Sequence, residues 1–154
     1  MTFEPVHWTE WLKAVGPAVI AAFVAYVAYQ QWQTNKATLR EKLFDRRLKL
    51  FESTQEFFGE VIAAGRVNDK ALSAIWNVPL DARFLFDQKL ANHLQDIKKH
   101  ALAAKRFRTR IDHPKNEDDI EKNSDLEDAE LTWFVKESTS LHSHFEPYLR
   151  FGKF

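Results

Sequence analysis

Six histidines are the side chains best suited to acid–base or metal chemistry in a chain that contains no cysteine. Imidazole titrates near neutral pH and binds metals, whereas the lack of thiols excludes disulfides, thiolate zinc sites and cysteine nucleophiles. His93 and His100 are seven residues apart among polar neighbours, with no acidic ligand arranged beside them, and His142 and His144 would diverge on a helix. No H-E-x-x-H or comparable zinc spacing occurs. The sequence therefore predicts no metal site and no cofactor.

Other catalytic patterns are also missing from the sequence. No serine lies in a G-x-S-x-G context, and no glycine-rich phosphate loop occurs. The acidic run 117–130 is typical of a solvated loop and a helix start. The sequence therefore predicts a protein that is not an enzyme and has no catalytic residue.

Composition points to a helical protein of one domain. The chain has 154 residues, thirteen Phe and five Trp against only four Gly, which favours long helices over an all-β design. Lys and Arg together number 22, as do Asp and Glu, so the net charge is zero and gives no strong signal for nucleic acid.

A run without charged side chains occupies residues 14–35, between Lys13 and Lys36. A helix needs about 20 mainly apolar residues to cross a bilayer, so this run predicts a transmembrane helix. A cleaved signal peptide would need a positive N-terminal region, which is lacking, and a buried soluble helix is the other alternative. Terminal aromatics, a helix-starting proline and small residues at four-residue spacing would form the anchor: Trp11, Pro17, Ala18, Ala22, Ala25, Tyr29 and Trp32.

Basic side chains follow this run and are scarce before it. Residues 1–13 contain one Lys and two Glu, whereas six basic residues follow the run: Lys36, Arg40, Lys42, Arg46, Arg47 and Lys49. The positive-inside rule then predicts that the C-terminal side lies in the cytoplasm and the short N-terminus outside, in a protein of the inner (cytoplasmic) membrane. Its parts would be a short extracytoplasmic N-terminus (1–13), a transmembrane helix (14–35) and a cytoplasmic helical bundle domain (36–154).

Helical periodicity and punctuation divide residues 36–154 into three long helices and a short one. The first would continue from the transmembrane helix toward Gly59 and Gly65, and a short helix would cover 69–77 before a link at 80–86. A long helix would follow over 87–111, with Asp87 as its cap, and then a polar loop over 112–123. Ser124 and Glu127 would cap the last helix, which would end near Pro147, with Phe151 and Phe154 folding back. The phenylalanines and tryptophans would form the core.

Three segments carry a resemblance to a known group of proteins. EKLFDRRLKLFESTQEFF, DARFLFDQKLANHLQDI and WF…HFEPYLRF are similar to sequences of a widespread uncharacterised bacterial family of small single-span membrane proteins. The similarity covers most of residues 36–151. It implies the same architecture, an N-terminal span followed by a cytoplasmic bundle, and supplies no catalytic residue.

A second resemblance concerns the HEPN ribonucleases. These enzymes use an arginine and a histidine four to six residues apart, and Arg108 and His113 have that spacing. The residue after Arg108 is Thr109 rather than the more common Asn, Asp or His. The alternative is a solvated basic helix end, whose cations complement the helix dipole.

Three functions follow from these patterns. The favoured one is a non-enzymatic membrane-anchored interaction module, which would bind membrane lipid, self-associate and receive a cytoplasmic protein partner. The second is an oligomeric membrane-perturbing or pore-forming effector of phage defence, similar in topology to CRISPR-associated accessory proteins with a divergent HEPN-like bundle. The third is a HEPN-like ribonuclease that uses Arg108 and His113.

Overall fold

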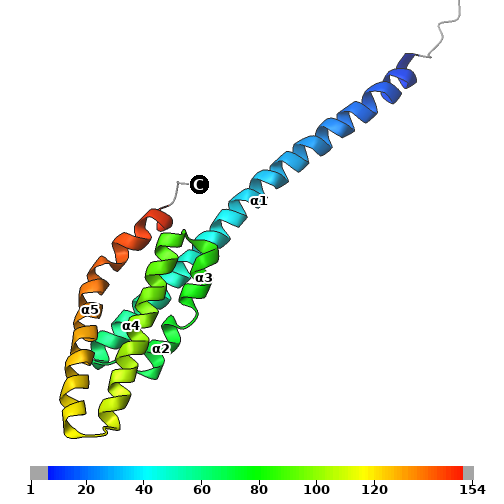
Figure 1. Cartoon of the computed structure of the whole chain (residues 1–154). Coiled ribbons are helices and arrows are strands. Elements are labelled where there is room, and N and C mark those ends of the chain that lie inside the picture. The colour runs from blue at the N-terminus through cyan, green and yellow to red at the C-terminus, as the bar shows by residue number, and fades with distance from the viewer. Residues whose placement is uncertain (1–6, 151–154) are drawn as a thin grey trace, which may run out of the picture. The chain divides into compact units, whose positions relative to one another are not determined.

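A computed structural model describes residues 7–150, with side chains for Lys13 and from Val15 onward. The predictions for the side chain of Trp11 and for Phe151 and Phe154 lie outside the described residues. The fold is all-α, with no strand among residues 7–150 (Figure 1). Its helices are α1 (His7–Ala64), α2 (Asp69–Ile75), α3 (Val78–Leu85), α4 (Gln88–Asp112) and α5 (Glu117–Leu149).

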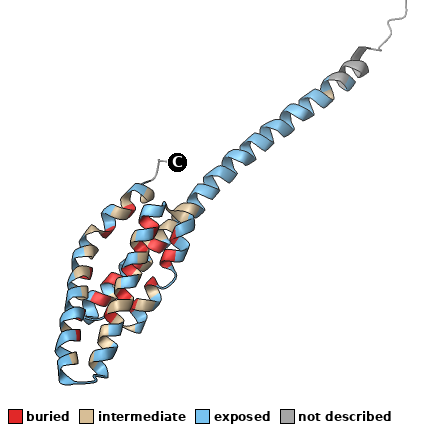
Figure 2. Ribbon diagram, viewed as in Figure 1, coloured by how far each residue is buried: buried red, intermediate tan, exposed pale blue. Residues whose placement is uncertain are grey.

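The chain divides into two compact units, Met1–Lys42 and Leu43–Phe154. The described part of the first unit is the N-terminal part of α1, and nearly all of its side chains are exposed (Figure 2). Among the helices that the structure describes, none is both long enough and apolar enough to cross a membrane. The structure therefore does not support the transmembrane helix predicted over 14–35. Gly16 and Pro17 interrupt the apolar run near its start, and residues 30–35 are mostly polar.

The second unit is a helical bundle built around aromatic side chains. Phe57, Phe134 and Phe145 are fully buried, and the rings of Phe57 and Phe134 meet edge to face with centroids 5.3 Å apart. Aliphatic side chains of α4, including Leu94 and Ile97, complete the core between α1 and α5. The prediction of an aromatic core is thus confirmed for these phenylalanines, whereas Trp76 and Phe84 are exposed.

Polar caps begin three of the helices. The side chain of Asn68 accepts a hydrogen bond from the backbone N–H of Ala71, and that of Asp87 accepts one from Leu90 at 2.9 Å. The predicted helix over 87–111 and its Asp87 cap are thereby confirmed. Because these side-chain oxygens satisfy amides that have no intrahelical partner, they fix where each helix begins.

The last helix begins earlier than the sequence predicted. The side-chain oxygen of Asn116 accepts from the N–H of Asp119 at 3.0 Å, and α5 starts at Glu117. The predicted loop over 112–123 and the cap by Ser124 and Glu127 are therefore wrong. Acidic side chains in the first turn favour this start because they oppose the positive end of the helix dipole.

The segment between α2 and α4 was also predicted incorrectly. The predicted link over 80–86 is largely helix α3, which begins beside Pro79, in a first turn where proline is tolerated. The structure thus has two short helices rather than the single one predicted. At the end of α1, Gly65 adopts a positive φ of 59°, which suits a glycine that ends a helix.

Candidate functional site

Helices α4 and α5 form an antiparallel hairpin that carries two histidine–glutamate pairs (Figure 1). His93 and His100 are two turns apart on α4, and Glu130 and Glu137 are two turns apart on α5. Residues seven apart lie close to one face of a helix. His93 meets Glu137 and His100 meets Glu130, each pair nearly symmetric along the chain about the turn at 113–116.

The first pair is joined by a second imidazole. His93 Nε2 lies 3.0 Å from Glu137 Oε1, and His144 Nδ1 lies 3.5 Å from the same oxygen. The two imidazole rings meet edge to face with centroids 4.3 Å apart. One possible ligand atom from each of the three residues lies within 4.8 Å of the others. We call these three residues the His–Glu–His cluster.

One imidazole nitrogen of each histidine in the cluster is buried and makes no hydrogen bond within the described residues. His93 Nε2 and His144 Nδ1 have no hydrogen-bond partner among the described residues, because their contacts with Glu137 have an ion-pair distance without hydrogen-bond geometry. Such unsatisfied polar atoms are uncommon in protein interiors and often mark a site for an ion or water. These two nitrogens are therefore available to bind an ion or a water molecule.

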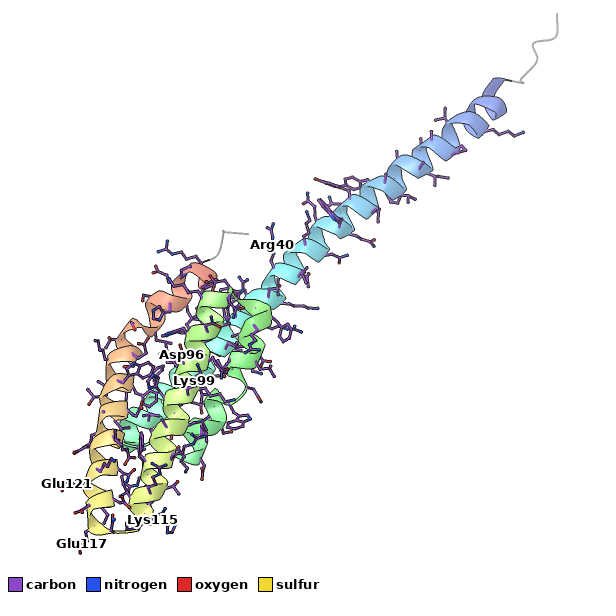
Figure 3. The ribbon with its side chains drawn as sticks, in the orientation of Figure 1. Arg40, Asp96, Lys99, Lys115, Glu117 and Glu121 are labelled. Carbon is purple, nitrogen blue, oxygen red and sulfur yellow. The ribbon has the colours of Figure 1, made fainter. Side chains whose placement is uncertain are left out.

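Burial disfavours the protonated form of His93. Desolvation, followed by the charge of His144, lowers the pKa of His93 below its usual 6.5, and Glu137 and Asp96 oppose this shift. Asp96 is itself paired with Lys99 at 2.8 Å on the surface of α4 (Figure 3).

Ser140 orients the carboxylate of the cluster. Its hydroxyl lies 2.9 Å from Glu137 Oε1 and 3.0 Å from the backbone oxygen of the same residue, in position to donate to either. Ser140 and Glu137 are both on α5, so the glutamate is held near the histidines by a contact within its own helix.

The second pair lacks another imidazole. His100 Nδ1 lies 2.6 Å from Glu130 Oε2, and the ring of His100 stacks on Trp133 with centroids 4.0 Å apart and planes at 19°. This histidine thus has a carboxylate partner and an aromatic cover, whereas His93 has a carboxylate partner and another histidine.

Sequence reasoning missed the His–Glu–His cluster. It predicted that His93 had no acidic partner and that the chain had no metal ligands, because Glu137 and His144 lie far along the chain. One signal was available: two histidines and two glutamates at matching seven-residue spacings, on opposite sides of a turn. That signal could be used only with the turn placed correctly, at 113–116. The sequence predicted a longer loop, over 112–123, and a later start of the last helix.

The structure does not place Arg108 and His113 in one pocket. Arg108 Nε lies 3.3 Å from Asp112, and its Nη1 lies 3.6 Å from the buried carboxylate of Glu127. Burial raises the pKa of Glu127, and Arg108 opposes that rise. His113 instead lines a pocket at the hairpin turn, whose described lining residues do not include Arg108: Arg110, His113, Lys115, Asp119, Lys122, Asn123 and Leu126.

Apart from Trp11, the predicted anchor residues lie on one exposed helical segment. Ala18, Ala22 and Ala25 are exposed, and Pro17 lies within α1. Tyr29 and Trp32 are half-exposed neighbours with ring centroids 6.1 Å apart. Lys36 Nζ lies 3.6 Å above the Trp32 ring, an arrangement that favours a cation.

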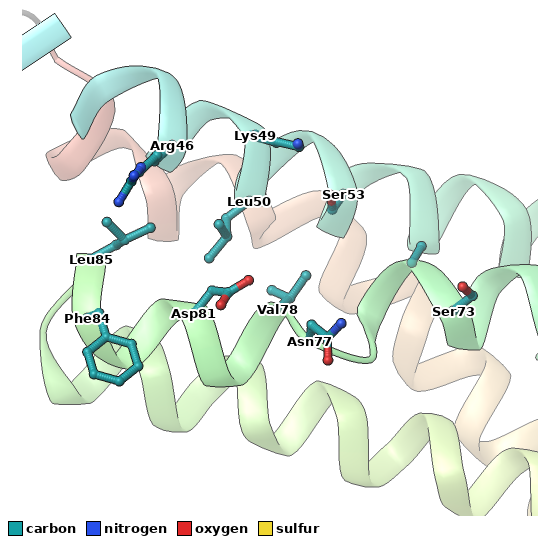
Figure 4. Close-up of a pocket in the computed structure, with 11 residues that line it drawn as sticks. Arg46, Lys49, Leu50, Ser53, Ser73, Asn77, Val78, Asp81, Phe84 and Leu85 are labelled. Carbon is teal, nitrogen blue, oxygen red and sulfur yellow. The ribbon is translucent and has the colours of Figure 1, made fainter. Parts of the chain in front are cut away.

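The predicted juxtamembrane basic residues fall into both units, with Lys36, Arg40 and Lys42 in the first and Arg46, Arg47 and Lys49 in the second. Arg47 Nε donates to the backbone oxygen of Leu85 at 2.9 Å, so its side chain packs on the end of α3. Arg46 and Lys49 line an open pocket of about 620 Å³ together with Asp81 (Figure 4). The three basic residues of the second unit are thus part of the bundle surface, where Arg47 contacts α3 and the other two line the pocket.

Comparisons with protein-family models, with curated proteins and with solved structures gave no match in any of the three. The resemblance to a bacterial family of single-span proteins therefore stays a prediction.

Proposed function

We propose that this protein is a non-enzymatic interaction module that attaches to a membrane through residues 14–35 and self-associates there. The observation that supports this best is the exposed apolar surface of the segment. Ile20 and Phe23 are 65% and 66% exposed, and no charged side chain lies between Lys13 and Lys36. Exposed apolar surface of this kind typically marks an interaction with a membrane or another protein.

The segment has two faces of different chemistry. At about 100° per residue, the larger apolar side chains cover one half of the helix: Val15, Val19, Ile20, Phe23, Val24 and Val27. The other half is mostly alanine: Ala18, Ala21, Ala22, Ala25 and Ala28. Small residues let two helices approach closely within a bilayer, where packing rather than water drives association. The large face would contact lipid, and the alanine face would contact a second copy.

The end of the segment suits a membrane interface. Tyr29 and Trp32 place amphipathic rings next to Lys36, and aromatic and basic side chains are typical of the headgroup level. Basic side chains near an anionic leaflet contribute about 1 kcal/mol each. With the positive side inside, the bundle would face the cytoplasm, where it would receive a protein partner.

Membrane fractionation of bacterial cells that express the full chain tests the attachment. We expect the wild type in the membrane pellet after an alkaline wash, and Ile20→Lys shifted to the supernatant, because a lysine at the centre of a span costs about 2.5–3.5 kcal/mol. The matched control is Leu39→Lys, which places the same charge at a residue that is 60% exposed and outside the segment. Wild type in the supernatant, or equal behaviour of both variants, would refute the attachment.

Crosslinking in the same membranes tests the self-association. We expect crosslinked dimers or larger species of the wild type. Ala22→Leu should give far fewer, because a bulky side chain on the alanine face keeps the two helices apart. Val24→Phe adds comparable bulk, four side-chain carbons against three, on the opposite face and should leave the crosslinked species unchanged. If the wild type yields monomers only, the self-association is wrong.

A further inference from the structure

The His–Glu–His cluster contains a set of ligands that transition metals prefer. Imidazole suits zinc, copper, iron and nickel, and two histidines with one carboxylate are a recurrent protein ligand set for zinc and for non-haem iron. The three residues come from two helices, His93 from α4 and the other two from α5. Their side chains converge although they are remote in the sequence.

The distances in the cluster are close to those around one ion. Ligands about 2.0–2.1 Å from a tetrahedral Zn²⁺ are roughly 3.3 Å from one another. The two measured separations from Glu137 Oε1 are 3.0 Å and 3.5 Å, and one ligand atom of each residue lies within 4.8 Å of the others. Binding of one ion by all three residues would require the ligand atoms that are up to 4.8 Å apart to move closer together.

Two further features separate this cluster from an ordinary ion pair. Its two inward imidazole nitrogens are buried without hydrogen-bond partners among the described residues, so each has an unused lone pair or proton. The neighbouring His100–Glu130 pair, by contrast, is closed by a 2.6 Å contact and the stacked Trp133. A metal ion would satisfy both nitrogens of the first cluster, whereas the second pair is already satisfied.

We propose that His93, Glu137 and His144 bind one divalent transition-metal ion, Zn²⁺ fitting best, between α4 and α5. Three protein ligands leave a fourth tetrahedral position for water. The His144 side chain is 38% exposed, which gives an ion access from solvent. Ser140, which contacts the carboxylate of Glu137, is the partner that would orient this ligand. The site is independent of the proposed membrane attachment.

Metal titration of the purified full chain tests the site. The detergent-solubilised protein is treated with EDTA, freed of chelator and titrated with Zn²⁺ in a calorimeter, and with Co²⁺ while the visible spectrum is recorded. We expect one Zn²⁺ per chain and a Co²⁺ absorption band that Zn²⁺ abolishes. Thermal unfolding should shift to a higher temperature with Zn²⁺.

Two variants test proposed ligands, and a third tests the residue that would orient one of them. His144→Ala and Glu137→Gln each remove one ligand, and both should weaken Zn²⁺ binding by more than the roughly 10–100-fold that loss of an outer partner costs. Ser140→Ala removes such an outer partner and should weaken binding within that range. Both ligand variants replace side chains that are partly exposed, and circular dichroism without metal checks that they fold.

His100→Ala is the matched control, because it removes a histidine from an equivalent pair on the same helix. It should bind Zn²⁺ within about twofold of the wild type. The proposal is overturned if the wild type binds no Zn²⁺, if His144→Ala and Glu137→Gln bind as the wild type does, or if His100→Ala weakens binding as much as they do. A preference for Fe²⁺, Co²⁺ or Ni²⁺ over Zn²⁺ would keep the site and change the ion.

Discussion

Residues of the same type have opposite environments in this protein. Phe134 is fully buried and meets Phe57 and Phe58 edge to face, whereas Phe84 on α3 is 84% exposed. Trp76 is half-exposed, and its ring and backbone oxygen both contact the Lys98 ammonium group, at 4.0 Å from the ring centroid and 2.8 Å from the oxygen. The contribution of an aromatic residue to stability therefore follows from its neighbours and not from its type.

The two phenylalanines give a matched test of this difference. Phe134→Ala should lower the free energy of unfolding by about 3–5 kcal/mol, because it leaves a cavity at the centre of the aromatic cluster. Phe84→Ala should change it by less than about 0.5 kcal/mol. Urea denaturation followed by circular dichroism measures both. Similar losses for the two variants would contradict the assigned core.

At the scale of elements, one carboxylate connects the start of α4 with the end of α5. Asp87 caps α4 through the N–H of Leu90, and it also accepts a hydrogen bond from the Tyr148 hydroxyl. These hydrogen bonds lower the pKa of Asp87 below its usual 3.8. Burial and the contact with Asp87 raise the pKa of Tyr148 to about 12. The cap thus also joins the two ends of the helical hairpin.

Removal of this cap should destabilise the bundle in a pH-dependent way. Asp87→Ala should lower the free energy of unfolding by about 0.5–2 kcal/mol at pH 7. Because the folded pKa is lowered, the stabilisation is present above pH 3.8 and is lost as the pH falls through the folded value.

The free energies of unfolding of the wild type and of Asp87→Ala should therefore become similar in strong acid. Urea unfolding at pH 7 and at acid pH measures the difference between them. Asp96→Ala, which removes a carboxylate paired on the surface of α4, should change stability by less than about 0.5 kcal/mol. An equal loss at both pH values would show that the ionised cap is not the cause.

At the scale of the whole molecule, burial is confined to one of the two units. Every described core residue lies at Leu50 or later, and no described side chain before it is buried. Residues 43–150 therefore contain every core residue that the structure describes, whereas the described side chains of the first unit are not part of that core. Apolar side chains in that unit are available for contacts with lipid or with another chain.

A chain shortened to residues 43–154 should consequently keep the stability of the bundle. We expect its urea midpoint to match that of the full chain in the same detergent, since none of the described side chains before Leu43 is buried. Its denaturant slope should change little, because that slope follows the surface exposed on unfolding. Circular dichroism reports both quantities. A lower midpoint or a loss of cooperativity would show that residues before Leu43 stabilise the bundle.

The local signals in the sequence were sufficient for several elements. Helical periodicity predicted the helix that contains Phe57 and Phe58, and their residue type predicted that they are buried. Asp87 predicted the start of α4. Periodicity and capping were sufficient there because both act within a few turns of one helix. The start of α5 was missed because two capping signals compete there. Asn116 forms the cap, and Ser124 lies within the helix.

The sequence by itself determined an all-α chain with an aromatic core and an N-terminal apolar segment without charge. These properties depend on composition and on helical period, which are local. Only the tertiary structure decided that His93, Glu137 and His144 meet and that Arg108 pairs with Glu127. Such contacts depend on the register of two antiparallel helices, and a shift in their turn by a few residues would pair different side chains. Register is set by packing of the whole bundle, which no single segment of the sequence contains.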